Sequence, residues 1–404
     1  MGIVPALPPP AAPRYPLRAP GEGGASMAQA TSAALDCAIV GGGIVGLAHA
    51  LVAARAGLRT AIVERDARCI GASIRNFGFI TVTGQEAGDC WRRARRARDI
   101  WAEIAPQAGI PVHHRGLLFA ARRPEALAVL EEFAAGPMGE GCRILTAEEA
   151  ASLGGALRPD LRGALLSPHE LRVESRHAIR RLTAWMQEAL GVRILPGTAV
   201  HAVEPGRLHT TAGTIAARRI LVCPGTDLRT LFPDVFARRS VTLCKLHMLR
   251  VAAPSWRLPG AVMSDLGLVR YLGYAGCPSL PALAARLKAE QAQALADGVH
   301  LIAVQDAGDG TLVVGDSHHY GPAPDPFQPE AVDRLILDEL SAVLDLPAPR
   351  VIERWVGVYP SGPETAFIEA PMPGVRLVSV TSGTGASTAF GLAEDTFAGW
   401  EDGT

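Results

Sequence analysis

Residues 36–64 read DCAIVGGGIVGLAHALVAARAGLRTAIVE, and this stretch decides the fold of the protein. A short apolar run ends in three glycines, a run of helical length follows, and a second short apolar run ends at Glu64. This order predicts a strand, a turn, a helix and a second strand. In such a unit, Gly41 permits the tight turn, Gly43 lets the backbone approach a pyrophosphate, and Gly46 lets the helix pack closely on the strand. The helix start binds phosphates, and the acid accepts ribose hydroxyls. The stretch therefore predicts a dinucleotide-binding β-α-β unit.

The composition of the chain is typical of a globular protein with a large core. Its 404 residues are enough for two domains, and 48% of them are hydrophobic while 20% are charged. The 39 Lys and Arg residues nearly balance the 40 Asp and Glu residues, so we expect no nucleic-acid partner. The sequence lacks an apolar run of the ~20 residues that would cross a bilayer, so we expect no membrane partner either.

A helix expected over residues 85–108 carries five arginines on its polar side. Its apolar side holds Trp91, Trp101 and Ile104 at helical spacing, which predicts that this side packs on the core. A run of arginines can bind nucleic acid. In a chain of nearly neutral charge, we interpret it as the solvated face of an amphipathic helix.

The seven cysteines are scattered through the sequence and form no CxxC pair. Their odd number and irregular spacing argue against a disulfide framework and against a zinc site. We therefore expect no metal in the protein, and we expect a reducing, cytoplasmic location.

The first residues of the chain differ from the rest. Residues 1–30 are rich in Pro, Ala and Gly and lack the apolar segment of a secretory signal. This composition predicts a disordered tail. Because the first strand begins soon after Met27, the native start is either Met1 or Met27, and an intact-mass measurement of the native protein would decide between them.

A second glycine-rich junction between a strand and a helix lies near the C-terminus. The strand-like residues 375–380 lead into TSGTGAST at residues 381–388, which opens the last helix. With a dinucleotide already implied, the start of this helix can point N–H groups at a ring carbonyl or a phosphate of the same cofactor.

Several strings, in order, resemble the D-amino-acid-oxidase superfamily of FAD-dependent amine oxidoreductases, which includes glycine oxidase and sarcosine oxidase. The matching strings are the first fingerprint with Glu64, SIRNFG at 73–78, CPG at 223–225 and SGTGAST at 382–388. The resemblance runs from about residue 35 to residue 394.

Within that superfamily, the chain resembles the subgroup associated with aminophosphonate catabolism. The strings that carry this finer resemblance are RNFG at 75–78, CKLHM at 244–248, CPSLP at 277–281, GDSHHYG at 315–321 and RWVGVY at 354–359.

The resemblance implies an α/β fold, α+β overall, with two domains. A Rossmann-like FAD-binding domain around a largely parallel sheet is expected from residues 35–112, 170–240 and 350–404. A second, mostly antiparallel β substrate domain is expected from residues 113–169 and 241–349.

The resemblance also implies the residues that contact FAD. The matching positions are Gly41, Gly43, Ile44, Val45, Gly46, Glu64, Arg65, Ser73, Arg75, Asn76, Phe77, Gly78, Val203, Cys223, Gly225, Gly383, Thr384, Gly385, Ala386, Ser387 and Thr388. Sarcosine-type relatives attach the flavin to a Cys in the strand that reads VGVY here, at 356–359. That strand has no Cys, so we expect non-covalent FAD.

The substrate end departs from the better-known relatives. Glycine- and D-amino-acid-type members hold the substrate carboxylate with an Arg at the position of Tyr359, and the cations of sarcosine-type members correspond to Phe79 and Ser387. The usual carboxylate clamp is therefore expected to be absent. A phosphonate would need its own donors, and our candidate substrate-binding residues are Arg75, Lys245, His247, Tyr271, His318 and Tyr359.

The candidate residues can also have roles other than substrate binding. Lys245 can point to solvent from its strand, and Arg75 can serve FAD phosphates. His318 and His319 are adjacent, so only one of them can face the cavity from an extended chain, and we favour His318. Tyr271 and Tyr359 can be walls of the cavity or core residues.

The expected reaction is oxidative deamination of a small aminophosphonate, such as an N-methylated or hydroxylated 2-aminoethylphosphonate. Hydride transfer to the flavin gives an imine, which hydrolyses to an aldehyde; the flavin carries the chemistry, so no catalytic side chain is named. Three alternatives stay open: an amine or amino-acid oxidase with a non-phosphonate substrate, a non-catalytic flavoprotein, and an NAD-dependent dehydrogenase. Oxygen is one candidate electron acceptor, and the oligomeric state is open.

Overall fold

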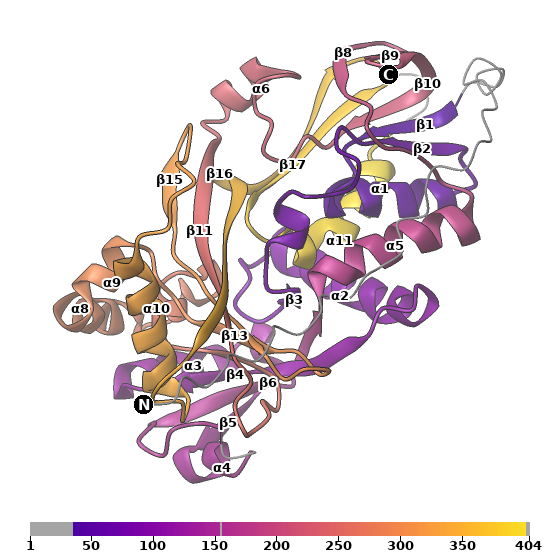
Figure 1. The fold of residues 1–404 in the computed structure, drawn as a ribbon. Coiled ribbons are helices and arrows are strands. Elements are labelled where there is room, and N and C mark those ends of the chain that lie inside the picture. The colour runs from indigo at the N-terminus through magenta and orange to yellow at the C-terminus, as the bar shows by residue number, and fades with distance from the viewer. Residues whose placement is uncertain (1–34, 154–155, 401–404) are drawn as a thin grey trace, which may run out of the picture. The chain divides into compact units, whose positions relative to one another are not determined.

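The computed structural model describes residues 35–153 and 156–400 (Figure 1). The tail predicted for residues 1–30 and the choice between Met1 and Met27 lie outside these residues. Among the residues that the structure describes, no helix combines the length and apolar character that a membrane span requires.

A parallel sheet carries the first glycine turn. Its central strand, β1 (Leu35–Val40), lies between β2 (Thr60–Val63) and β10 (Gly213–Val222), and both pair with it in parallel. β7 (Arg193–Leu195) adds to β2, and β17 (Val375–Ser382) adds to β10, again in parallel. All four residues of β2 are buried, as expected of a strand with both faces covered.

Four helices cover one side of this sheet. They are α1 (Ile44–Arg55), α2 (Asp89–Gln107), α5 (Ser175–Leu190) and α11 (Gly385–Ala398). Figure 1 shows α1, α5 and α11 next to β1 and β2. Trp101 of α2 and Phe390 of α11 pack edge to face, with ring centroids 5.3 Å apart, inside a core cluster that also holds Ile39 and Leu47.

The opposite side of β10 carries a smaller layer. β8 (Val200–Glu204), β9 (Arg207–Thr210) and the first residues of β10 form an antiparallel ribbon. α6 (Pro233–Arg238) contributes Val235 and Phe236 to the core cluster beneath this ribbon.

A mostly antiparallel sheet forms the rest of the molecule. β11 (Thr242–Val251) pairs antiparallel with β14 (Leu312–Gly315), β15 (His319–Gly321) and β16 (Val351–Met372). β14 continues through β13 (Ile302–Gln305) to β12 (Ala261–Met263). One parallel pairing then joins β12 to β4 (Val112–Ala121).

β4 leads the sheet into its last group of strands. β6 (Gly163–Val173) pairs antiparallel with β4, β3 (Phe79–Ile80) and β5 (Arg143–Thr146). The predicted α/β class, with a parallel sheet and a mostly antiparallel one, is confirmed. The predicted domain boundaries stay a prediction.

Strand β16 belongs to both sheets. Its first half pairs with β11, and its second half pairs with β17, so that Ser361 is opposite Thr242 on one side and Ser382 on the other. In Figure 1 this strand runs from the antiparallel sheet up to the parallel one.

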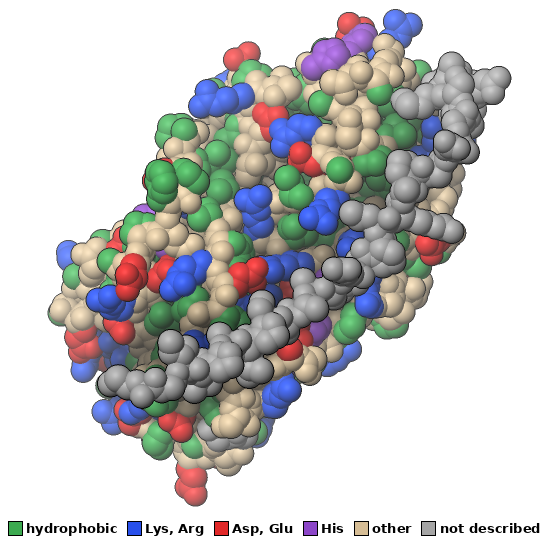
Figure 2. All heavy atoms as spheres, in the orientation of Figure 1, with side chains coloured by type: hydrophobic (Ala, Val, Ile, Leu, Met, Phe, Trp, Pro, Cys, Tyr) green, Lys and Arg blue, Asp and Glu red, His purple; other side chains and the backbone are tan. Residues whose placement is uncertain are grey.

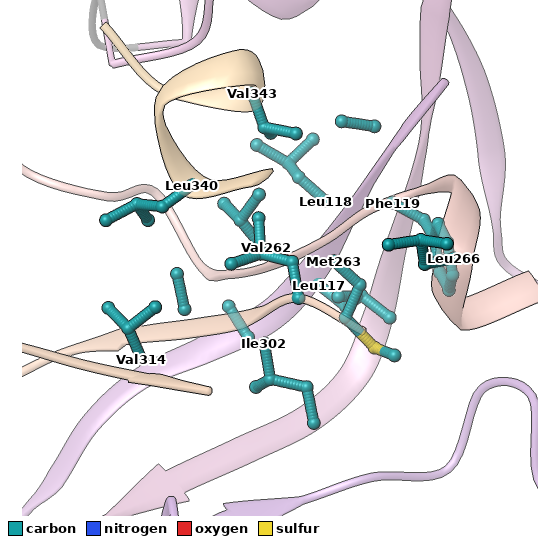
Figure 3. Close-up of a cluster of buried hydrophobic side chains, with 14 of the residues drawn as sticks. Leu117, Leu118, Phe119, Val262, Met263, Leu266, Ile302, Val314, Leu340 and Val343 are labelled. Atoms are coloured by element: carbon teal, nitrogen blue, oxygen red, sulfur yellow. The ribbon is translucent and has the colours of Figure 1, made fainter. Parts of the chain in front are cut away.

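Shorter helices and a second large core complete the chain. The remaining helices are η2 (Ala72–Ile74), α3 (Pro124–Ala135), η3 (Pro137–Gly139), α4 (Ala147–Ser152), α7 (Asp265–Leu268), η4 (Leu272–Tyr274), α8 (Leu280–Glu290), α9 (Ala292–Ala296) and α10 (Glu330–Val343). Figure 3 shows Leu340 and Val343 of α10 among buried side chains of β4, β12, β13 and β14. α10 therefore closes one face of the antiparallel sheet.

Charged side chains of both signs are interspersed on the face seen in Figure 2. The arginines of α2 show the same balance, because Arg92 and Arg93 bond Asp395 of α11 and Arg96 bonds Glu394. This helix therefore uses three of its five arginines to fasten α11.

Candidate active site

The first glycine turn has the geometry that a dinucleotide site needs. Gly41 has a φ of 101°, and a Cβ at this position would collide with the carbonyl oxygen of Cys223. A Cβ at Gly46 would collide with the carbonyl oxygen of Gly41. Gly43 lies at the start of α1 and lines a cavity of about 420 Å³. Because Gly43 has no side chain, its backbone is open to a ligand in this cavity.

Glu64 lies at the end of β2, beside this turn. Its Oε2 accepts a hydrogen bond of 2.7 Å from the N–H of Gly42, and its Oε1 accepts one of 2.9 Å from Asp66. The Oγ of Ser73 accepts a bond of 2.9 Å from the N–H of Ile44. An acid and a hydroxyl therefore flank the open end of α1, which fits the ribose and diphosphate of a dinucleotide.

The second glycine turn closes the other side of the cavity. Gly383 has a φ of 75°, and a Cβ there would lie 3.0 Å from the ring of Tyr359. Ser387, in the first turn of α11, is buried, and its Oγ accepts a bond of 2.8 Å from the N–H of Thr81. The two helix starts therefore face a single cavity.

Most of the predicted cofactor residues line this cavity. They are Gly43, Ile44, Val45, Gly46, Ser73, Arg75, Asn76, Phe77, Cys223, Gly225, Gly383, Thr384, Gly385, Ala386 and Ser387. Asn76 also holds its own turn, because its Oδ1 accepts bonds from Gly78 and Ser175.

Six predicted cofactor residues are not part of the lining: Gly41, Glu64, Arg65, Gly78, Val203 and Thr388. The first two shape the glycine turn, and Arg65 is an exposed side chain 3.5 Å from Asp227. Gly78 packs against the backbone of Val173, and the Oγ1 of Thr388 donates to the carbonyl of Thr384. Their roles toward a cofactor stay predictions.

The substrate end of the cavity contains a cation that sequence reasoning missed. Arg270 follows α7 and lines the cavity, and its Nη2 donates to the Oη of Tyr320 at 3.0 Å and to the Oη of Tyr359 at 3.4 Å. Within residues 35–153 and 156–400, no carboxylate lies within 4 Å of this guanidinium. The only sequence signal was an isolated arginine between apolar residues, next to the predicted Tyr271.

A second polar group faces the same cavity. His300, Asp316 and His318 are all buried, and all three line it. The Nδ1 of His300 lies 3.1 Å from Asp316 Oδ1, and the Nε2 of His318 lies 3.7 Å from Asp316 Oδ2. Burial lowers the pKa of both histidines well below the usual value and raises the pKa of Asp316 to about 7.

The structure corrects the placement of two predicted substrate residues. Side chains alternate along β11, so Leu246 lines the cavity while Lys245 and His247 leave the strand on its other face. The Nζ of Lys245 donates to Asp325 and to the carbonyl of Phe327, and His247 Nδ1 lies 3.2 Å from Asp333 Oδ1. These two side chains therefore fasten β11 to residues 325–333 and do not reach a substrate in this cavity.

The other four predicted substrate residues line the cavity: Arg75, Tyr271, His318 and Tyr359. His319, the neighbour of His318, points away and bonds Asp297 Oδ1 at 3.0 Å. The Nε of Arg75 donates to the carbonyl of the exposed Ile70.

Comparisons with solved structures show the fold. Glycine oxidase from Geobacillus kaustophilus is 20% identical, with a TM-score of 0.71 over 90% of this chain and 93% of that one. L-α-glycerophosphate oxidase from Mycoplasma pneumoniae, solved with FAD bound, is 17% identical, with a TM-score of 0.68 over 91% and 96%. Iminodiacetate oxidase from Chelativorans sp. BNC1 is 18% identical, with a TM-score of 0.65 over 89% and 94%.

A search by sequence among curated proteins found no match. The family comparison covers nearly all of the described chain, because residues 36–398 match the family described as DAO, FAD dependent oxidoreductase. Both glycine turns and every residue of the cavity lie inside that range. The chain is thus a member of the DAO family and an FAD-dependent oxidoreductase.

Proposed function

We propose that the protein oxidises a small amine that carries an anionic group, and that Arg270 binds this group. The observation that carries the proposal is the guanidinium in the cavity, which has two tyrosine hydroxyls as partners and no carboxylate within 4 Å among the described residues. A guanidinium is always charged, and removing such a charge from water is costly unless an opposite charge is nearby. An anionic substrate would supply that charge.

FAD, when bound, would accept a hydride from the carbon that bears the amine. The protein positions the substrate and excludes water from the cavity. Gly43 and Gly225 line the cavity without a side chain that would obstruct the cofactor, and Gly46 lets α1 pack against the turn. Phe77 and Leu246 add apolar wall to the cavity. Tyr359 packs on Gly383, so the substrate end is fixed directly against the second glycine turn.

A phosphonate is our first candidate for the anionic group. The finer resemblance of the sequence to aminophosphonate-catabolism proteins supports it, as do three converging donors, Arg270, Tyr320 and Tyr359, for a group with three acceptor oxygens. Lys245 and His247 lie outside the lining of this cavity and are not among these donors. The substrate would be an N-methylated or hydroxylated 2-aminoethylphosphonate, and the product would be an aldehyde.

A carboxylate is the second candidate. Arg270 is one cation, and a single positive charge matches a carboxylate as well as it matches a singly ionised phosphonate. Among proteins that share the fold, one is named for glycine and another for iminodiacetate, both amines with carboxylate groups.

Anaerobic mixing of the purified flavoprotein with a substrate panel tests these proposals. The panel contains 2-aminoethylphosphonate and its N-methyl and 1-hydroxy derivatives, glycine, sarcosine, iminodiacetate and D-alanine, with ethylamine as the amine that lacks an anionic group. We expect one anionic amine, and not ethylamine, to bleach the flavin absorbance. Bleaching by ethylamine at an equal rate would refute the role of Arg270, and no bleaching by any amine would favour a non-catalytic flavoprotein.

A further inference from the structure

The buried group opposite Arg270 has a fixed backbone. His300 precedes β13, Asp316 follows β14, and the two residues exchange backbone hydrogen bonds of 3.1 Å and 2.9 Å. The N–H of His318 donates to the carbonyl of Asp297, and its Nδ1 lies 2.8 Å from the carbonyl of Gly298. The three side chains are therefore held side by side by main-chain contacts that do not involve a ligand.

These side chains have unused hydrogen-bonding capacity. Asp316 Oδ1 and both ring nitrogens of His300 are buried without a hydrogen-bond partner among the described residues. Because Nδ1 of His318 donates to a carbonyl, its Nε2 is the unprotonated nitrogen, and it faces Asp316. A neutral imidazole has one N–H and one lone pair, so His300 leaves one donor and one acceptor unpaired. With Asp316 Oδ1 and Nε2 of His318, most of the unpaired groups are acceptors, which indicates a ligand with N–H donors.

An alkylammonium has this character, since it offers three donors and accepts nothing. Neutral His300 and His318 offer lone pairs, and Asp316 offers a carboxylate. The cavity therefore presents a cation, Arg270, and an acceptor group in the same space, which matches a zwitterion with one anionic group and one amine.

We propose that Asp316, together with His300 and His318, binds the ammonium group of the substrate and takes one proton from it. The step converts R–NH₃⁺ and the Asp316 carboxylate into R–NH₂ and the neutral acid; no bond to carbon changes. The freed lone pair on nitrogen is what lets the adjacent carbon lose a hydride and become an iminium. The proposal rests on the proposed function and adds a role for each group of the acceptor cluster.

The surroundings of Asp316 favour this exchange. The titratable and charged groups near it are His300 before β13, His318 before β15, Arg270 and Tyr271 after α7, and Cys244 in β11. Burial favours the neutral acid, while Arg270 favours the carboxylate, and burial dominates. In such a site, burial disfavours both charges of an ammonium–carboxylate pair, so the neutral amine and acid become accessible.

A metal ion is the competing occupant. The ligand atoms of the three side chains lie within 4.8 Å of one another. Arg270 argues against it, because a divalent cation cannot lose its charge beside a guanidinium, whereas an ammonium can.

Calorimetry on the purified holoprotein tests the proposal without turnover. The probes are 2-aminoisobutyrate, which has no hydrogen on the amine-bearing carbon, and pivalate, which has a methyl in place of the ammonium. Titrations in buffers of different ionisation enthalpy count the protons released on binding. Because burial raises the pKa of Asp316 to about 7, the ammonium probe should release nearly one proton well below that pH and almost none well above it.

Pivalate should bind without this release. Asp316→Asn should bind pivalate as the wild type does, but it should bind 2-aminoisobutyrate at least tenfold more weakly and with no proton release. Asp297→Asn, a matched change at a residue that bonds His319, should behave as the wild type in both titrations.

Three results would overturn the proposal: equal proton release by the two probes, 2-aminoisobutyrate binding no tighter than pivalate, or a stoichiometric metal in the wild type that is lost in Asp316→Asn. Failure of the proposed function has a different signature. If no amine reduces the wild-type flavin, the function fails; if amines reduce it but the two probes behave alike, only the role of Asp316 fails.

Discussion

The two ends of the cavity are built in different ways. The cofactor end uses backbone, since two glycine turns leave the starts of α1 and α11 open to a ligand. The substrate end uses single side chains from distant places in the sequence: Arg270 after α7, Asp316 after β14 and Tyr359 in β16. The first end is a property of local sequence, and the second is a property of the assembled sheet. Mutations should therefore act differently at the two ends.

The largest effect is expected at the cofactor end. Gly46→Val places a side chain against the carbonyl of Gly41, so α1 cannot pack at the turn, and we expect the protein to purify without flavin. Gly57→Ala is the control. A Cβ there meets nothing within 4 Å, so despite the positive φ it should cost only about 1 kcal/mol of stability and keep its flavin. The absorbance spectrum of each purified variant measures the outcome; a fully loaded Gly46→Val protein would show that the turn is not the cofactor site.

The next largest effect is expected at Arg270. Arg270→Met removes two charge-assisted hydrogen bonds to the substrate, together about 3 kcal/mol, so kcat/KM should fall by about 100-fold or more. Bound flavin should stay unchanged, because the glycine turns are intact. Arg334→Met, at an exposed arginine paired with Glu330, is the matched control and should keep full activity. Equal kinetics for the two variants would remove Arg270 from the substrate site.

A smaller, pH-dependent effect is expected at His49. This buried residue of α1 bonds Thr396 of α11 at 3.0 Å, and burial lowers its pKa from 6.5 to about 4. As the pH falls, His49 takes up a proton in the unfolded chain before it does so in the folded protein. The contribution of neutral, buried His49 to the free energy of unfolding is therefore fully present above pH 6.5 and is lost as the pH falls toward 4. We expect the wild type to lose about 2 kcal/mol between pH 7 and pH 5 from this group.

Denaturant titrations at the two pH values measure that loss. His49→Gln should reduce the loss by about this amount, while His201→Gln, at an exposed residue of β8, should not change it. An unchanged pH dependence in His49→Gln would assign the acid sensitivity to another group.

The smallest effect on catalysis is expected at Lys245. Its side chain is on the far face of β11, so Lys245→Met should leave KM within about twofold of the wild type. The melting temperature should fall, because the bonds to Asp325 and Phe327 are lost. Steady-state kinetics beside thermal melts separate the two effects, and a KM increase as large as that of Arg270→Met would return Lys245 to the substrate site.

The same contrast explains what the sequence could and could not predict. Gly41, Gly46 and Glu64 belong to one contiguous β-α-β stretch, so their spacing in the sequence predicts that they lie together at the turn. β11 is buried on both faces, and such a strand reads as a nearly continuous apolar run, so its sequence does not reveal that Leu246 rather than Lys245 faces the cavity. Arg270 reaches the cavity only because the chain turns after α7, and no local pattern encodes that position.

The shared strand β16 limits how the molecule can open. Its pairing passes from β11 to β17 at Ser361, with one irregular stretch between Ser361 and Ala366, so a hinge between the two sheets would have to lie in that stretch or break strand pairing. We expect small ligands to enter by movement of surface segments at the mouth of the cavity, such as the turn around the exposed Leu272, while Tyr359 of β16 stays packed against Gly383. A cavity whose walls are held at a fixed spacing in this way would select substrates by their length.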